Sequence, residues 1–310
     1  MMLLGGVVLS SCTVESGAQD NPASPDVQAK STPLTFLAKG TGDITVNISI
    51  TLPNPITYTK NGGPATAITA TTSIPVAEGD EVCFFSKNSA LASGYRNCVR
   101  FGTTADCDIY GNVMSLIDDE GNGFENDVTI GMPHALLNLF TEAEKINIHS
   151  TRKLLLPATT LADSCYSSMF NCCTSLTTAP ELPATTLKKY CYGFMFWGCT
   201  SLSAQAILPA MTLAEYCYHC MFKNCTSLTT APVLPAPTLV ANCYNAMFDE
   251  CTSLNYVKCL ATDVSAEDCT DFWLFDVAKE GTFVKAAGME AWPSNWSGIP
   301  SGWTITDGTE

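Results

Sequence analysis

Hydrophobic and polar positions recur with a period of 26 residues between residues 156 and 259. Each copy opens on Leu-Pro, continues with a Cys-Tyr and a Met-Phe pair, and closes on Cys-Thr-Ser-Leu. Because one such unit is too short to bury an apolar face by itself, the period predicts stacked units that share one continuous core. The recurring positions expected to form this structural ladder are Leu156, Leu182, Leu208, Leu234, Cys165, Cys191, Cys217, Cys243, Cys173, Cys199, Cys225, Cys251, Phe170, Phe196, Phe222 and Phe248.

The spacing of apolar residues inside a unit predicts its secondary structure. From Leu161 to Cys173 these residues are three and four apart, which is typical of one face of a helix of about three turns. Thr160 and Asp163 are placed like a helix-capping pair. The threonine-rich segment that follows ends at Pro180 and suits a short strand. We therefore expect an α/β solenoid in which each unit is a leucine-rich-repeat coil with one short strand and one short helix.

The closing segment of each unit carries a resemblance to a known family. The sequence Phe-x-x-Cys-Thr-Ser-Leu occurs at 170–176, 196–202, 222–228 and 248–254. It resembles the BspA-type leucine-rich repeat, which is found in surface proteins of anaerobic gut and oral bacteria. The resemblance implies the repeat fold, and it implies adhesion to host matrix or plasma proteins. It is specific for the fold and weak for the ligand.

The first residues predict where the protein goes. Residues 1–8 are almost wholly apolar and lead into Leu-Ser-Ser-Cys, a pattern typical of a bacterial lipoprotein signal in which Cys12 is acylated. A short apolar tail with a coincidental cysteine is the alternative. No later stretch has the roughly 20 apolar residues needed to span a bilayer. We therefore expect the lipid to be the only membrane anchor, with the protein displayed at the outer membrane or cell surface.

A second kind of structure is expected ahead of the repeats. From Asp43 to Leu52, apolar and polar residues alternate as in a half-buried strand, and several turn signals follow at the spacing of a small β-sandwich. The expected organisation is a signal segment at 1–12, a flexible tether at 13–30, a β-sandwich-like domain at 31–112, a connecting segment and N-terminal cap with a degenerate repeat at 113–155, the solenoid at 156–275 and a C-terminal cap at 276–310.

Charge and cysteine content narrow the partners. The formal net charge is −15, from 30 acidic and 15 basic residues, which argues against a nucleic-acid partner. Sixteen cysteines in an exported chain suggest disulfides. However, two cysteines eight residues apart on a helix would be about 12 Å apart, too far for a bridge. We therefore favour buried, unpaired thiols over disulfides for the two repeated series, and we expect no metal site.

Residues that could support catalysis are scarce. None of the usual nucleophile, zinc-protease or phosphate-loop motifs occurs. His219 is one of three histidines, and its position is Ser167, Gly193 and Asn245 in the other units. A position that varies so freely is expected on the exposed convex surface. We therefore predict a protein that is not an enzyme and needs no cofactor.

The surface left for recognition is the concave strand face and the loops around it. We expect a monomer that binds a protein of the host or of neighbouring cells there. Glycan capture is the first alternative and would require exposed aromatic platforms. The chain offers Tyr256 on this face, Trp197 on the convex side and the remaining tryptophans in the C-terminal region. A hydrolase is the second alternative. The candidate binding residues are Thr177, Thr178, Glu181, Ser203, Gln205, Thr229, Thr230, Asn255 and Tyr256.

Overall fold

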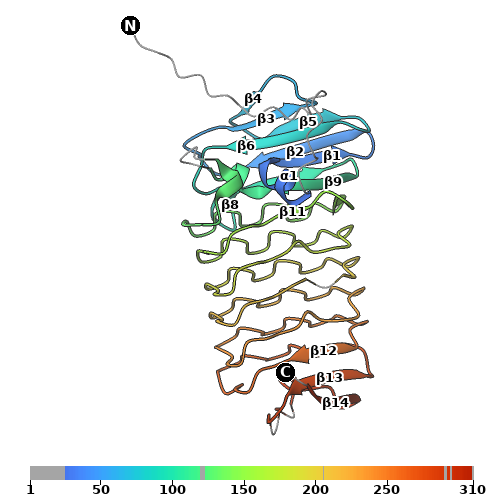
Figure 1. Cartoon of the computed structure of the whole chain (residues 1–310). Coiled ribbons are helices and arrows are strands. Elements are labelled where there is room, and N and C mark those ends of the chain that lie inside the picture. The colour runs from blue at the N-terminus through green and yellow to red at the C-terminus, as the bar shows by residue number, and fades with distance from the viewer. Residues whose placement is uncertain (1–24, 119–122, 205, 290–291, 294, 309–310) are drawn as a thin grey trace.

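Strands and turns, rather than helices, dominate the computed structural model, which describes residues 25–118, 123–204, 206–289, 292–293 and 295–308. It is 28% strand and 4% helical, with three sheets. The helices are short: α1 (Pro25–Ser31) and the 3-10 helices η1 (Val113–Leu116) and η2 (Phe124–Asn126). Figure 1 shows a strand-rich end, a stack of flat loops in the middle and a small sheet at the opposite end.

Two sheets form the strand-rich end. The larger has the order β10 (Ile146–Ile148), β9 (Cys107–Asn112), β1 (Leu34–Ala38), β6 (Glu81–Ser86), β3 (Ile56–Lys60) and β4 (Thr66–Ile68), and β11 (Leu154–Leu155) also pairs with β9. The smaller has the order β5 (Thr72–Val76), β2 (Gly42–Ile48), β8 (Asn97–Thr103) and β7 (Ala92–Gly94). All pairs are antiparallel except those of β10 and β11 with β9.

Aromatic side chains join the two sheets to the repeats. Phe84 on β6 lies 4.8 Å from Phe101 on β8, measured between ring centroids, and Phe36 on β1 lies 5.6 Å from both. Phe140, which precedes the first full repeat, packs 6.1 Å from Phe101 and 5.2 Å from Phe170. One hydrophobic core therefore runs from the sheets into the repeats.

The segment expected to be helical is a chain of overlapping turns. The backbone N–H of Ser167 donates to the carbonyl of Ser164, and that of Met169 to the carbonyl of Tyr166, both at 3.2 Å. Every fourth residue is left-handed, with φ of 55° at Ser164 and 54° at Ser168. An α-helix cannot contain such residues, because it needs a right-handed conformation at every position. We call residues 162–173, 188–199, 214–225 and 240–251 the turn ribbons.

The predicted α/β leucine-rich-repeat solenoid is therefore wrong, since the repeats contain no helix within the described residues. The pattern is ambiguous because the turn ribbon also buries residues in pairs four apart, as at Cys165 with Tyr166 and at Met169 with Phe170. The strand expected between Cys173 and Pro180 does not form either. Among the described residues of the four units, only the last forms a strand, β12 (Tyr256–Cys259). It makes the third, parallel sheet with β13 (Gly281–Ala286) and β14 (Trp303–Gly308).

Backbone hydrogen bonds between units use the amides that the turns leave free. The N–H of Tyr166 donates to the carbonyl of Cys191 at 3.1 Å, and that of Phe170 to Met195 at 2.9 Å. The same ladder reaches back to the segment before the first full repeat, where Phe140 donates to Met169 at 2.8 Å. Successive backbone amides thus alternate: one bonds within its own unit and the following one bonds to the next unit. The buried N–H donors of the ribbon are therefore satisfied only when units stack.

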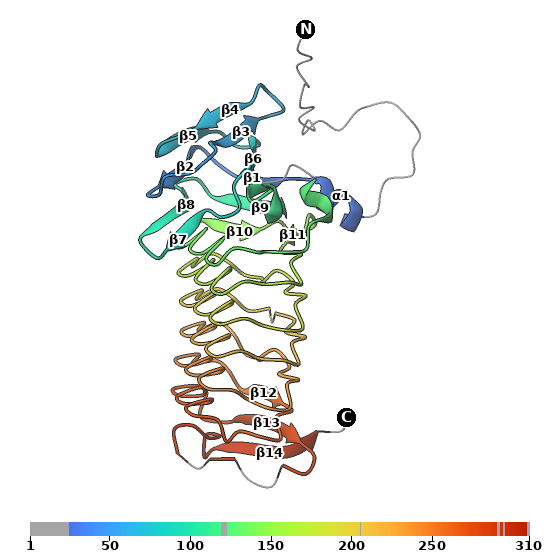
Figure 2. The ribbon, with the colours of Figure 1, turned by 90° about the vertical axis from the view of Figure 1, so that its left-hand side faces the viewer.

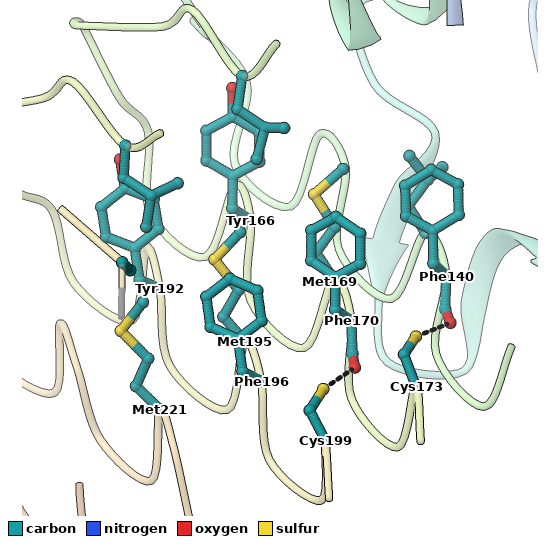
Figure 3. Close-up of a cluster of buried hydrophobic side chains, with 14 of the residues drawn as sticks. Phe140, Tyr166, Met169, Phe170, Cys173, Tyr192, Met195, Phe196, Cys199 and Met221 are labelled. Carbon is teal, nitrogen blue, oxygen red and sulfur yellow. Dashed lines mark hydrogen bonds between the residues drawn. The ribbon is translucent and has the colours of Figure 1, made fainter. Parts of the chain in front are cut away.

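The second series of repeated cysteines adds a side-chain bond to each step (Figure 3). The thiol of Cys173 donates to the carbonyl of Phe140 at 3.0 Å, and the thiol of Cys199 to that of Phe170 at 3.1 Å. The other two members of the series repeat this contact one and two units further on. Burial raises the pKa of the Cys251 thiol to about 12, which keeps it protonated as a donor.

The cysteines of both repeated series are free and buried, which confirms the expectation of unpaired thiols. The leucines and phenylalanines of the ladder are also buried, and the rings of Phe170, Phe196 and Phe222 stack 5.6 and 5.5 Å apart. Among the described residues, no helix is both long and apolar enough to cross a membrane.

Substituting Cys199 with alanine tests the thiol ladder. The change removes a buried sulfur and a hydrogen bond, so we expect a loss of about 1–3 kcal/mol in the free energy of unfolding. Its neighbour in the adjacent repeat, Cys172, is half-buried and outside the ladder, and Cys172→Ala should cost less than about 0.5 kcal/mol. Urea unfolding of both variants measures the difference, and equal losses would show that the thiol bond does not stabilise the stack.

Candidate binding site on the turn ribbons

A hollow of about 750 Å³ lies where the β7–β8 hairpin meets the turn ribbons of the first repeats. Figure 2 shows these two strands at the end of the stack. Tyr95, in the hairpin connection, borders it on one side, and Tyr190, Phe194 and Trp197 of the second ribbon border it on the other. Tyr95 and Trp197 are 47% and 37% exposed. The hollow is therefore lined with aromatic rings that solvent can reach.

The rings of the second and third ribbons support one another. Tyr190 and Tyr216 are stacked with centroids 4.5 Å apart and planes 8° from parallel. Phe194 and Trp197 lie 5.9 Å apart at a tilt of 42°. The stacking follows from the repeat, because Tyr190 and Tyr216 occupy the same position in consecutive units. The register that builds the core thus also builds this outer cluster.

His219 packs beneath the aromatic cluster rather than on an exposed surface, so its predicted position is wrong. Its ring meets Phe194 at 4.9 Å, Tyr216 at 5.5 Å and Tyr190 at 6.4 Å, each nearly edge-on. Burial lowers the pKa of His219, which favours the neutral imidazole. Variation at this position was misleading, because Ser167 and Gly193 are buried there, and His219 and Asn245 are partly buried.

Polar groups hold the hairpin against the ribbons. The hydroxyls of Tyr95 and Ser167 are 3.0 Å apart, and the Asn138 amide donates to the carbonyl of Tyr95 at 3.1 Å. These bonds hold Tyr95 against the first ribbon and the segment that precedes it. Hydroxyl and amide side chains of Ser164, Ser168 and Asn171 also line it, beside the aromatic rings.

Arg100 and Glu142 are charged residues that line the hollow, and an ion pair of the second and third ribbons lies beside it. Lys189 donates to Glu215 at 2.7 Å, and its ammonium lies 5.9 and 5.7 Å from the rings of Tyr190 and Tyr216. The bond to Glu215 raises the pKa of Lys189. Glu142 is the single carboxylate among the described residues of the lining. No group of three or more metal-ligating side chains occurs in the described part of the chain.

The predicted binding residues lie away from this hollow. Thr177, Thr178, Glu181, Ser203, Thr229 and Asn255 are exposed, and Thr230 and Tyr256 are partly buried. Backbone bonds bring Ser203 against Thr177 at 3.2 Å and Asn255 against Thr229 at 2.9 Å. The face is not the concave sheet that was expected, because the described residues between β11 and β12 form no strand. Gln205 and the predicted lipidation site Cys12 lie outside the described residues.

The aromatic residues of the hollow were not predicted as a site, although the sequence carries a signal for them. At the position of Tyr190 the first and fourth units have Ser164 and Asn242, and at that of Trp197 the first unit has Asn171. A large ring at a position that is polar in other units has no role in the repeated core, so it is free to serve recognition.

Comparisons with protein-family models, curated proteins and solved structures give no match.

The partly buried imidazole of His219 predicts that the stability of the protein depends on pH. Because the pKa of His219 is lowered by folding, the unfolded chain takes up a proton first as the pH falls, and stability is lost below about pH 6.5. His219→Asn, the residue of the next unit, should reduce this loss. Urea midpoints at pH 7.5 and 5.5 measure it, and an identical drop in both proteins would contradict the assignment.

Proposed function

We propose that this chain is a non-enzymatic surface protein that captures neutral glycan chains in the aromatic hollow. The observation that carries the proposal is the combination of Tyr95, Tyr190, Phe194 and Trp197 with hydroxyl and amide groups around one hollow. The axial C–H groups of a sugar give it an apolar face that packs on the electron-rich face of an aromatic ring. Its hydroxyls need the neighbouring polar side chains.

The size and charge of the hollow support the same ligand class. Its volume of about 750 Å³ falls within the range of small-ligand sites, roughly 300–1,000 Å³. A stable protein partner would need about 800 Å² of complementary surface on each side. Arg100 and Glu142 bring one charge of each sign to the lining, and Lys189 beside it is paired with Glu215, so the net charge is small and suits an uncharged ligand.

Protein adhesion at the originally predicted face is the second candidate. Three apolar side chains of the same repeats, Ile207, Met211 and Val233, are exposed, and exposed apolar side chains are a feature of protein-binding surfaces. Substituting Ser203 and Thr229 with lysine tests this candidate without touching the hollow. Loss of a captured host protein in these variants, with unchanged glycan binding, would favour adhesion.

Affinity electrophoresis through gels containing starch, xylan, mannan or cellulose derivatives tests the glycan proposal. We expect retardation by at least one polysaccharide, and about tenfold weaker retardation for Tyr190→Asn or Trp197→Asn, since each removes one stacking ring. Both substitutions introduce a residue that another unit carries at the same position, so the fold is expected to persist. Absence of retardation by every polysaccharide, or no effect of either variant, would overturn the proposal.

Surface display depends on the predicted acylation of Cys12. The resemblance of the repeats to bacterial surface proteins supports this location. Cys12→Ala should move the protein from the membrane fraction to the soluble fraction when the chain is expressed with its native leader. Membrane retention of this variant would contradict the lipid anchor, and Cys172→Ala serves as the control.

A further inference from the structure

We infer that the glycan site extends along the turn ribbons to a second aromatic platform at the far end of the stack. This inference rests on the proposed glycan function. The platform consists of Phe272, Phe275 and Trp296, which are 41%, 52% and 60% exposed. Phe272 and Trp296 stack 5.8 Å apart with planes 5° from parallel, and Phe275 meets Phe272 edge-on at 5.8 Å. The fold thus leaves three aromatic rings substantially exposed to solvent at this end of the stack.

Hydrogen bonds between units show that the rings of the hollow and the rings of the far platform lie in one line along the stack. Phe194 donates to the carbonyl of His219, Cys220 to that of Asn245, and Ala246 to that of Asp271, at 2.8, 2.9 and 2.7 Å. Phe194 and Phe272 therefore occupy the same ribbon position three units apart.

A parallel column gives the same register. The backbone N–H of Gly198 donates to the carbonyl of Lys223 at 2.8 Å. In the same way the N–H of Asn224 donates to the carbonyl of Asp249 at 2.7 Å, and that of Glu250 to the carbonyl of Phe275 at 2.9 Å. Trp197 and Phe275 are therefore also equivalent positions three units apart. Two ring positions of the hollow thus recur at the far platform.

The positions between the platforms are small or polar. Cys220 and Ala246 stand between Phe194 and Phe272, and both are buried. In the column of Trp197, the intervening residues are Lys223 and Asp249, which form an ion pair at 2.6 Å. No large side chain therefore projects between the platforms in the Phe194 column. Lys223 also lies 3.4 Å from Glu250, so this part of the path carries one cation and two carboxylates.

Asn242 and Asn245 flank the same path on its other side. The amide of Asn245 donates to the side-chain oxygen of Asn242 at 3.2 Å, which leaves further amide donors and acceptors near the surface. Amides of this kind suit the hydroxyls of an uncharged sugar chain. The path therefore offers rings at both ends and hydrogen-bonding groups between them.

The distance between the platforms sets a length requirement. Three unit steps of about 4.8 Å each separate equivalent positions by roughly 14 Å. A short oligosaccharide bound in the hollow cannot also reach the far platform, whereas a longer linear chain can occupy both. Binding through two linked contacts raises affinity beyond that of either one. We therefore expect a step in affinity at the chain length that first spans this distance.

Titration calorimetry with oligosaccharides of the malto, cello, xylo and manno series, from disaccharide to decasaccharide, tests the inference. In the series that binds, affinity should rise about tenfold over a narrow range of chain length. Phe272→Ala, which introduces the residue of the preceding unit at that position, should abolish this rise and leave the binding of short chains unchanged. Trp296→Ala should have the same effect.

The outcomes separate the inference from the proposed function. Failure of all oligosaccharides to bind would overturn the proposed function together with the inference. Binding of short and long chains with equal affinity, or a length step that persists in both variants, would overturn the inference alone. Equal losses for short and long chains would also overturn it, because the platform would then act through the fold. The urea midpoint of each variant identifies that case.

Discussion

Each repeat unit satisfies only part of its own backbone, and this constraint decides the rest of the structure. In the turn ribbon, every second backbone N–H donates to the carbonyl three residues earlier. The other N–H groups have no partner until another unit lies beside them. Leaving such donors buried and unbonded costs about 1–3 kcal/mol each. A single unit is therefore unstable alone, and the stack is stabilised by its neighbours. The carbonyl of Phe170 shows the coupling, because it accepts from Cys173 of its own unit and from Cys199 of the next.

The same geometry separates the structural positions from those that we propose bind the ligand. The ribbon buries pairs of side chains four positions apart, as at Cys165 with Tyr166, and has a left-handed residue every four positions. Inward positions must match from unit to unit, since Phe170 stacks on Phe196 and Tyr166 on Tyr192. Outward positions can differ, and the aromatic rings of the hollow and of the far platform stand there. The hollow also needs Tyr95 from the β7–β8 connection, so the strand-rich end completes the site.

Part of the architecture could be predicted from the sequence. The period, the core ladder and the free thiols follow from residues that recur 26 apart. The conformation of the unit could not, because Cys165, Tyr166, Met169 and Phe170 fit one face of a helix as well as they fit the ribbon. The left-handed positions were also hidden: only some of them carry the expected Gly or Asn, as at Gly198 and Asn224, whereas others are Tyr or Phe. The site brings together residues about 100 positions apart, which periodicity alone cannot reveal.

Hydrogen exchange of the backbone amides, with and without a bound neutral polysaccharide, tests most directly whether the constant positions build the stack and the variable ribbon positions bind. In the free protein we expect both sets of ribbon amides to be protected. On binding, further protection should be confined to the ribbons at 188–199 and 214–225, the far platform and the β7–β8 hairpin. Protection of the segments around Thr177 and Ser203 instead, or no change at the ribbons, would contradict the account.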